Sequence, residues 1–223
     1  ELRHCYLRPI VVRTGEQMGV YGVDAPVETF IIAWNWGSYL GNDAPEHGVD
    51  VCVSSWRRAA PDTFPGLAKA SGNYLSSQLS KMEARVNRYS EGIMLDNFGH
   101  VAEGSGENLF VVKDGVIFTA SLGASILKGI TRDSVMVIAR GLGYEVREES
   151  IPRELLYIAD EAFFSGTAAE LTPIRSVDRI QVGDGKPGAM TRAIQTQYLG
   201  ICKGEIEDRF GWLTMVPESV TIA

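Results

Sequence analysis

No apolar run in this chain approaches the ~20 residues that a membrane-spanning helix requires. The sequence also lacks a long basic stretch, and its net charge is -7. Nucleic acids and anionic membranes attract basic surfaces, so neither is expected as a partner. The signatures of two hydrolase classes, GxSxG and HExxH, are missing as well.

Cysteine and histidine are scarce. Cys5, Cys52 and Cys202 are odd in number, far apart and free of any CxxC spacing. This usage fits a reducing cytoplasm and argues against a disulfide scaffold or a zinc site. The three histidines are equally scattered, so no bound metal is expected.

One apparent nucleotide-binding motif is set aside. Residues 183–188 read GDGKPG and match GxGxxG letter for letter. The match lies near the C-terminus, contains Pro187 and lacks the second strand and the acidic residue of a dinucleotide-binding unit. We interpret it as a loop.

The 223 residues are 45% hydrophobic, which is enough to form a substantial core. Strands come in clusters broken by a few helices, which favours a mixed α/β (α+β) fold over a regular doubly wound sheet. Lys113-Asp114-Gly115 between two apolar runs predicts a hairpin. Predicted strands cover Val27–Trp34, Val49–Trp56, Gly92–Asp96, Asn108–Val112 and Val116–Ala120, and predicted helices cover about Asn73–Val86, Thr131–Leu142 and Met190–Cys202.

The N-terminal part has a different character. The chain begins without Met or a signal-peptide pattern, and Arg13–Ala25 is rich in Gly and polar residues. We expect residues 1–25 to contain the end of a small domain and a linker, with an upstream part preceding them. Residues 26–223 are expected to form one large domain.

The first candidate catalytic residue is a lysine whose sequence neighbours are small and uncharged. Lys69 follows the apolar segment Phe64–Ala68, and Tyr74 lies five residues further on. A lysine forms an imine only through its neutral amine, which partial burial favours. The alternative is an ordinary surface lysine.

Two turns are suited to anions. Gly129-Ile130-Thr131 leads into a predicted helix whose first N–H groups attract phosphate, although Thr131 is equally suited to cap that helix. Gly166-Thr167-Ala168 follows an apolar strand, and its small residues allow backbone amides to approach a ligand. A plain turn is the alternative for this second segment.

A carboxylate completes the set. Glu103 sits between Ala102 and Gly104, where a fixed acid would keep a nearby pyridine nitrogen protonated and make it a better electron sink. Glu107 competes for that role but is expected to be structural. A lysine, a carboxylate and two anion-binding turns predict pyridoxal 5'-phosphate as cofactor.

From Tyr6 to about Leu213, these motifs resemble in order and spacing the branched-chain amino acid aminotransferases of the fold type IV pyridoxal phosphate enzymes. The resemblance implies the large C-terminal domain of that architecture, a mixed sheet or barrel-like core surrounded by helices. It implies that Lys69 forms the Schiff base, Tyr74 contacts the phenolic oxygen and Glu103 pairs with the pyridine nitrogen. The remaining cofactor contacts implied are Leu127 on the ring, with Gly129, Ile130, Thr131, Gly166 and Thr167 at the phosphate.

The resemblance also implies a substrate site. Tyr6 and Arg8 of Tyr6-Leu7-Arg8-Pro9 would organise carboxylate binding, and the amides of Thr167 and Ala168 would hold the α-carboxylate. Trp36 and Tyr39 would line the side-chain pocket. Val20 would act on a neighbouring subunit's site.

The implied reaction is transamination of leucine, isoleucine or valine with 2-oxoglutarate in a homodimer or higher oligomer. The family's small N-terminal domain, which supplies an arginine to the phosphate, is absent from this sequence. D-amino acid aminotransferase, amine transaminase, aminodeoxychorismate lyase and a non-catalytic oligomer-forming or binding domain remain alternatives. The chirality of the amino donor, pyruvate release and the presence of bound cofactor separate them.

Overall fold

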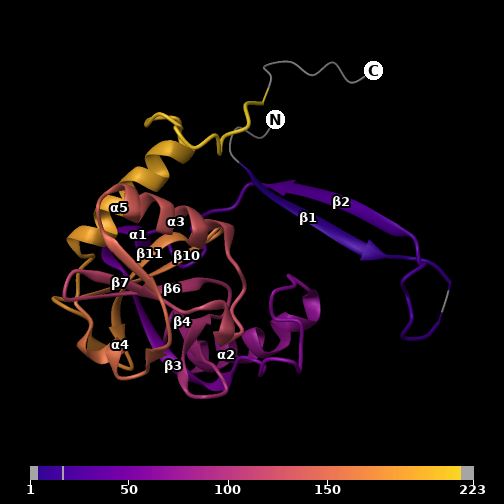
Figure 1. Cartoon of the computed structure of the whole chain (residues 1–223), viewed down its shortest axis with the longest axis horizontal. Coiled ribbons are helices and arrows are strands. Elements are labelled where there is room, and N and C mark those ends of the chain that lie inside the picture. Colours follow the sequence, from indigo (N-terminus) through magenta and orange to yellow (C-terminus); the bar gives the residue numbers. More distant parts are fainter. Residues whose placement is uncertain (1–4, 17, 217–223) are drawn as a thin grey trace.

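The computed structural model describes residues 5–16 and 18–216. Residues 1–4 of the predicted N-terminal segment and residues 217–223 of the predicted large domain therefore lie outside the described residues. Among the helices described, none is long and apolar enough to cross a bilayer. A closed barrel forms the body of the molecule, and a two-stranded hairpin stands out from it (Figure 1).

Six strands form the barrel in the order β6-β10-β11-β3-β4-β5, and pairing of β5 with β6 closes the ring. The pairs β11–β3 and β3–β4 are parallel and the other pairs are antiparallel, so the barrel is mixed as the sequence predicts. The barrel strands are β3 (Val49–Arg57), β4 (Glu91–Leu95), β5 (His100–Gly104), β6 (Asn108–Lys113), β10 (Glu161–Gly166) and β11 (Glu170–Val177).

The barrel interior is filled by the largest core cluster. Every barrel strand contributes to it, since it contains Val51, Ile93, Val101, Leu109, Phe164 and Ile174. Alternate residues of a strand point to opposite faces, so Leu109 and Val111 lie inside while Phe110 and Val112 join a second cluster outside. The helices α3 (Ile130–Gly141) and α5 (Ala189–Cys202) cover that outer face.

Helix α2 (Tyr74–Val86) connects the parallel strands β3 and β4 and packs on both. It follows a 3₁₀ turn at Ser71–Asn73 and begins just beyond Lys69. Smaller elements extend the sheet or fill its ends: α1 (Ala44–His47), β7 (Val116–Thr119), a second 3₁₀ turn (Leu122–Ala124), β8 (Glu145–Glu148), β9 (Ile151–Pro152), α4 (Leu155–Ile158) and β12 (Ile180–Gln181).

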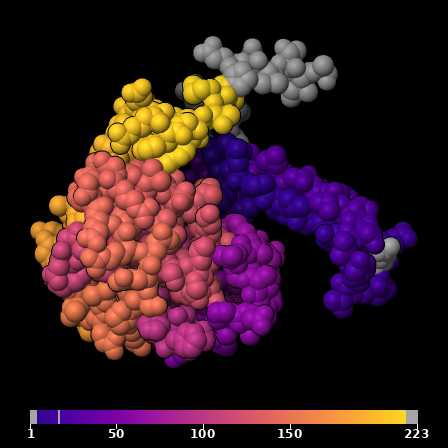
Figure 2. Space-filling view, in the orientation of Figure 1, coloured from indigo at the N-terminus to yellow at the C-terminus, as the bar shows by residue number. Residues whose placement is uncertain are grey.

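The projecting hairpin pairs β1 (Tyr6–Arg13) with β2 (Val27–Trp34) in antiparallel register. Both of its faces are open to solvent, and Val11, Phe30 and Ile31 are each at least half exposed. Figure 2 shows the hairpin reaching away from the body. Residues 14–16 and 18–26, which include most of the predicted linker, lie between these paired strands.

The elements that local patterns predict agree with the structure to within one or two residues. The five predicted strands correspond to β2, β3, β4, β6 and β7, and the three predicted helices correspond to α2, α3 and α5. Asp114 and Gly115 both adopt positive φ, which is the conformation that a tight β6–β7 hairpin demands. The GxGxxG match lies in the connection between β12 and α5, as the loop interpretation requires.

Phe163 provides a test of the packing between the barrel and α3 and α5. It is fully buried and its ring stacks on Phe110 with centroids 5.0 Å apart. Phe163→Ala should lower the free energy of unfolding by about 3–5 kcal/mol, because it removes a buried ring and leaves a cavity. Phe98 is 76% exposed, so Phe98→Ala should change it by less than about 0.5 kcal/mol in the same denaturant titration. Equal losses in the two variants would contradict this account of the core.

Candidate active site

A cavity of about 450 Å³ opens where the β5–β6 turn, the β10–β11 turn and the N-terminus of α3 meet. The loop that leads into α2 forms a further wall. All but one of the residues singled out from the sequence line this cavity: Tyr6, Arg8, Trp36, Tyr39, Lys69, Tyr74, Glu103, Leu127, Gly129, Ile130, Thr131, Gly166, Thr167 and Ala168. The exception is Val20, which is fully exposed in the β1–β2 connection.

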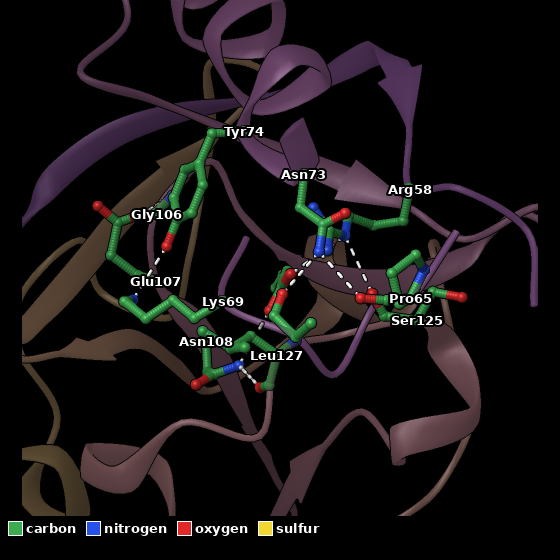
Figure 3. A network of polar contacts seen from close by, with 12 residues as sticks. Arg58, Pro65, Lys69, Asn73, Tyr74, Gly106, Glu107, Asn108, Ser125 and Leu127 are labelled. Atoms are coloured by element: carbon green, nitrogen blue, oxygen red, sulfur yellow. Dashed lines mark hydrogen bonds and ion pairs between the residues drawn. The ribbon is translucent and has the colours of Figure 1, made fainter. Parts of the chain in front are cut away.

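Lys69 and Tyr74 face one another, and the Lys69 amine donates a hydrogen bond of 2.9 Å to the Tyr74 hydroxyl (Figure 3). The side-chain amide of Asn73 donates to the carbonyl oxygens of Pro65 and Ala68, which fixes the loop carrying Lys69. In the single chain Lys69 is exposed, although the apolar segment before it is compatible with partial burial. The reason is that the segment before it is an irregular surface loop.

Glu103 is almost completely buried at the end of β5 and is held on both oxygens. Its Oε1 lies 3.1 Å from Nε of Arg58. Its Oε2 accepts hydrogen bonds of 3.0 Å from the Asn108 amide and the Leu127 N–H. The carboxylate therefore has one orientation, and it lines the cavity.

Burial raises the pKa of Glu103 to about 7, and the positive charges of Arg58 and Lys69 oppose that shift. Removing a carboxylate from water disfavours its charged form, whereas a nearby cation restores it. A cationic group bound in the cavity beside Glu103 would therefore hold the carboxylate ionised.

The N-terminus of α3 is formed without a side-chain cap. Gly129 is the N-cap residue in extended conformation, and Thr131 is buried. The first N–H groups of this 12-residue helix lack partners within the helix, so they provide an anion site. A Cβ at Gly129 would collide with the Asn108 amide oxygen, so the turn requires glycine at that position.

The β10–β11 turn packs against the β5–β6 turn, since the place of a Cβ on Gly166 lies 3.7 Å from the Gly106 carbonyl oxygen. Gly166 pairs with Glu170 across the turn, and Thr167 and Ala168 are left with amides outside the ladder. The buried Ser165 hydroxyl has no hydrogen-bond partner among the described residues. This wall of the cavity therefore offers polar atoms to a ligand.

An aromatic cluster closes the side of the cavity nearest the hairpin. The ring of Trp36 lies 4.6 Å from that of Tyr6 and 5.9 Å from that of Tyr39, measured between centroids. Arg8 stands over the Tyr6 ring with its Cζ 5.3 Å from the centroid. This pocket combines apolar surface with a cation, so its walls suit both an apolar and an acidic side chain.

Glu107, which we expected to be structural, is a buried part of the cavity wall. Its Oε2 accepts a long hydrogen bond of 3.2 Å from the Gly106 N–H, whereas its Oε1 has no partner among the described residues. Burial raises the pKa of Glu107 to about 8, and the negative charge of Glu91 adds to the shift while Lys81 opposes it.

Sequence reasoning missed Arg58 and the side chain of Asn108. Arg58 donates to the Ser125 carbonyl oxygen, and the Asn108 amide donates to the Leu127 carbonyl oxygen (Figure 3). Arg58 also pairs with Glu103, and Asn108 donates to Glu103 as well. The signal for Asn108 was its place in Glu103-Gly104-Ser105-Gly106-Glu107-Asn108. Arg58 carried no local signal, because its burial depends on a segment 67 residues away.

Residues 1–177 match the model of the amino-transferase class IV family. The chain belongs to this family. Among its curated relatives, the branched-chain-amino-acid aminotransferase of Escherichia coli strain K12 is 53% identical over 220 residues, which cover 96% of this chain and 70% of the relative. The sequence resemblance is thereby confirmed.

Solved structures of this aminotransferase family share the fold. A crystal structure of the E. coli branched-chain amino acid aminotransferase superposes with a TM-score of 0.92 at 53% identity, covering 95% of this chain and 70% of that one. The T.th. branched-chain amino acid aminotransferase with pyridoxamine 5'-phosphate gives a TM-score of 0.87 at 44% identity, covering 94% and 69%. The same T.th. enzyme has also been solved with 4-methylvaleric acid and with N-(5'-phosphopyridoxyl)-L-glutamate.

Because Glu107 is a buried acid with a raised pKa, we expect the stability of the protein to depend on pH. Glu107 ionises near its ordinary pKa of 4.5 in the unfolded chain but stays protonated up to a pKa of about 8 in the folded one. The folded state therefore binds the extra proton between these values, and the free energy of unfolding falls as the pH rises through this window. Glu107→Gln removes this loss, so its stability relative to the wild type should improve by about 1–3 kcal/mol between about pH 5 and about pH 8.

Denaturant titrations of both proteins across that pH range measure the effect. Glu149 is exposed, so Glu149→Gln should follow the wild-type curve. A stability difference between Glu107→Gln and the wild type that stays constant with pH would show that Glu107 does not carry the shifted titration.

Proposed function

We propose that this chain is a pyridoxal 5'-phosphate-dependent transaminase that moves the amino group of branched-chain L-amino acids to 2-oxoglutarate. The observation that carries the proposal is the convergence of Lys69, Glu103 and two anion-binding turns on one cavity. Family membership and the names of the close relatives support the same reaction. The substrates are then small amino acids and 2-oxo acids.

The residues present fit the cofactor. The uncapped N-terminus of α3, with Gly129, Ile130 and Thr131, would hold the phosphate together with Gly166 and Thr167. The bound cofactor supplies an electron sink, through its ring, for the charge left when the α-proton departs. The pyridoxamine 5'-phosphate in the T.th. relative supports this choice.

Around that group, each side chain has a task its geometry permits. The Lys69 amine would hold the cofactor covalently and, once displaced by substrate, move the α-proton as general base and then general acid. The 2.9 Å hydrogen bond to Tyr74 keeps the amine directed into the cavity. Glu103 would bind the pyridine nitrogen and keep its proton in place, and Leu127 would pack on the ring.

The same pocket must take two kinds of substrate. The amides of Thr167 and Ala168 would hold the α-carboxylate that both share, with Tyr6 organising the site. Trp36 and Tyr39 provide an apolar surface for a branched side chain, and Arg8 provides the cation for a second carboxylate.

We also propose a homodimer located in the cytoplasm. The exposed apolar residues on both faces of the β1–β2 hairpin support burial against another protein surface, and Val20 at its tip would then reach a neighbouring subunit's site. The free thiols of Cys5, Cys52 and Cys202 fit a reducing compartment. Residues 1–25 would join a small N-terminal domain to the large domain formed by residues 26–223.

An absorbance spectrum with L-leucine tests the proposal. The purified protein should show the visible band of bound cofactor, L-leucine should abolish it, and 2-oxoglutarate should restore it. A band that responds only to a D-amino acid or an amine would identify a sibling activity, and pyruvate release from aminodeoxychorismate would identify the lyase. No band with added cofactor would favour the non-catalytic alternative.

Lys69→Ala should lose both the visible band and turnover of L-leucine, because the covalent link to the cofactor requires the amine at this position. The matched control is Lys186→Ala, which alters a lysine in the β12–α5 connection, outside the residues that line the cavity. Spectra and single-turnover assays with L-leucine measure both effects. Wild-type turnover in Lys69→Ala would end the proposal.

Glu103→Gln should reduce kcat for L-leucine by ~100-fold with a smaller change in KM, because it removes a preorganised charge that matters most when the ring accepts electrons. Steady-state kinetics measure the change, with Glu149→Gln as the exposed control. A loss confined to KM would assign Glu103 to ground-state binding instead.

A further inference from the structure

Glu107 lies between the two turns that frame the substrate end of the cavity. Its Oε2 is 2.6 Å from the place where a Cβ on Gly104 would stand, and its Cγ is 3.7 Å from the corresponding place on Gly166. The side chain therefore touches both the β5–β6 turn and the β10–β11 turn. A side chain at position 104 would need the space that the Glu107 carboxyl group occupies.

Glu107 also lines the same cavity as Trp36 and Tyr39 of the side-chain pocket. The Tyr39 hydroxyl lies 3.6 Å from the place of a Cβ on Gly106, the residue next to Glu107. Burial, followed by the charges of Glu107 and Glu91, raises the pKa of Tyr39 well above its ordinary value. Glu107 and Tyr39 thus line one cavity, and the charge of one affects the pKa of the other.

The groups facing Glu107 do not fix it as an anion. Glu91 on β4 already pairs with Lys81 of α2 at 2.6 Å, and Glu103 on β5 pairs with Arg58. Lys81 also stands over the Tyr39 ring, with its Nζ 5.2 Å from the centroid. Both of these cations have other partners, and Glu107 keeps one buried oxygen without any among the residues described.

We propose that Glu107 determines which substrate the pocket accepts: protonated Glu107 admits the second carboxylate of an acidic substrate beside Tyr39, and ionised Glu107 excludes it. Apolar side chains carry no charge and are accepted in both states. A negative charge near another in a cavity shielded from water is repelled far more strongly than in solution. The inference rests on the proposed function and adds a residue that selects between its two substrates.

The test compares the binding of two acids that both carry a carboxylate at one end and differ at the other end, where only one of them has a second carboxylate. Glutarate represents the acidic substrate, and 4-methylvalerate represents the branched-chain one. Their dissociation constants for the cofactor-loaded enzyme are measured by calorimetry between about pH 6 and about pH 10, a range that spans the Glu107 pKa of about 8. The ratio of the two constants cancels any titration that acts on the shared carboxylate or the cofactor.

In the wild type, the affinity for glutarate should fall relative to that for 4-methylvalerate by at least ~10-fold as the pH rises across this range. The reason is that ionised Glu107 repels the second carboxylate of glutarate. In Glu107→Gln the ratio should stay at its low-pH value. Glu149→Gln should keep the wild-type pH dependence. Glu91→Gln removes a neighbouring negative charge and should move the midpoint to lower pH.

A wild-type ratio that does not change with pH overturns the inference, as does an unchanged pH dependence in Glu107→Gln. If L-leucine is converted normally in either case, the proposed function survives alone. If neither acid binds and L-leucine is not converted, the proposed function and the inference fail together.

Discussion

Closure of the barrel between β5 and β6 is the interaction on which the site depends. The closing pair joins Glu103 to Asn108, and the Gly104 N–H donates a 2.7 Å hydrogen bond to the Glu107 carbonyl oxygen to complete the turn between them. This one turn brings the carboxylate, its Asn108 partner and the buried acid Glu107 to the same end of the barrel. A change in register at this pair would rotate alternate side chains out of the cavity.

The neighbouring elements meet the closing turn for reasons of packing. The outer faces of β6 and β10 present Phe110 and Phe163 to α3, which places the N-terminus of that helix at the cavity. The parallel pair β3–β4 requires a crossover connection, which contains α2. Lys69 lies in this connection and therefore reaches the cavity from a segment other than β5–β6 or α3. Backbone amides, a lysine and two acids therefore converge although they are far apart in the chain.

Burial has a larger effect on the protonation of the acids in the cavity than the number of ionisable groups there. Glu103 and Glu107 both have raised pKa values, but Arg58 and two N–H donors hold the first, while one oxygen of the second is without a partner among the described residues. Two acids four residues apart thus have different environments. Because of this contrast, Glu103 is suited to remain an anion, whereas Glu107 is suited to change its charge.

The sequence by itself determined the local elements and the residues able to carry chemistry, because hydrophobic periodicity, the Asp114-Gly115 turn and the glycine-rich loops act over a few residues. It also indicated the family, since motifs kept their order and spacing. Only the tertiary structure decided the exposure of Lys69, the pairing of Arg58 with Glu103 and the burial of Glu107. Those properties arise when the barrel closes, because burial and proximity are set by segments that are distant in sequence.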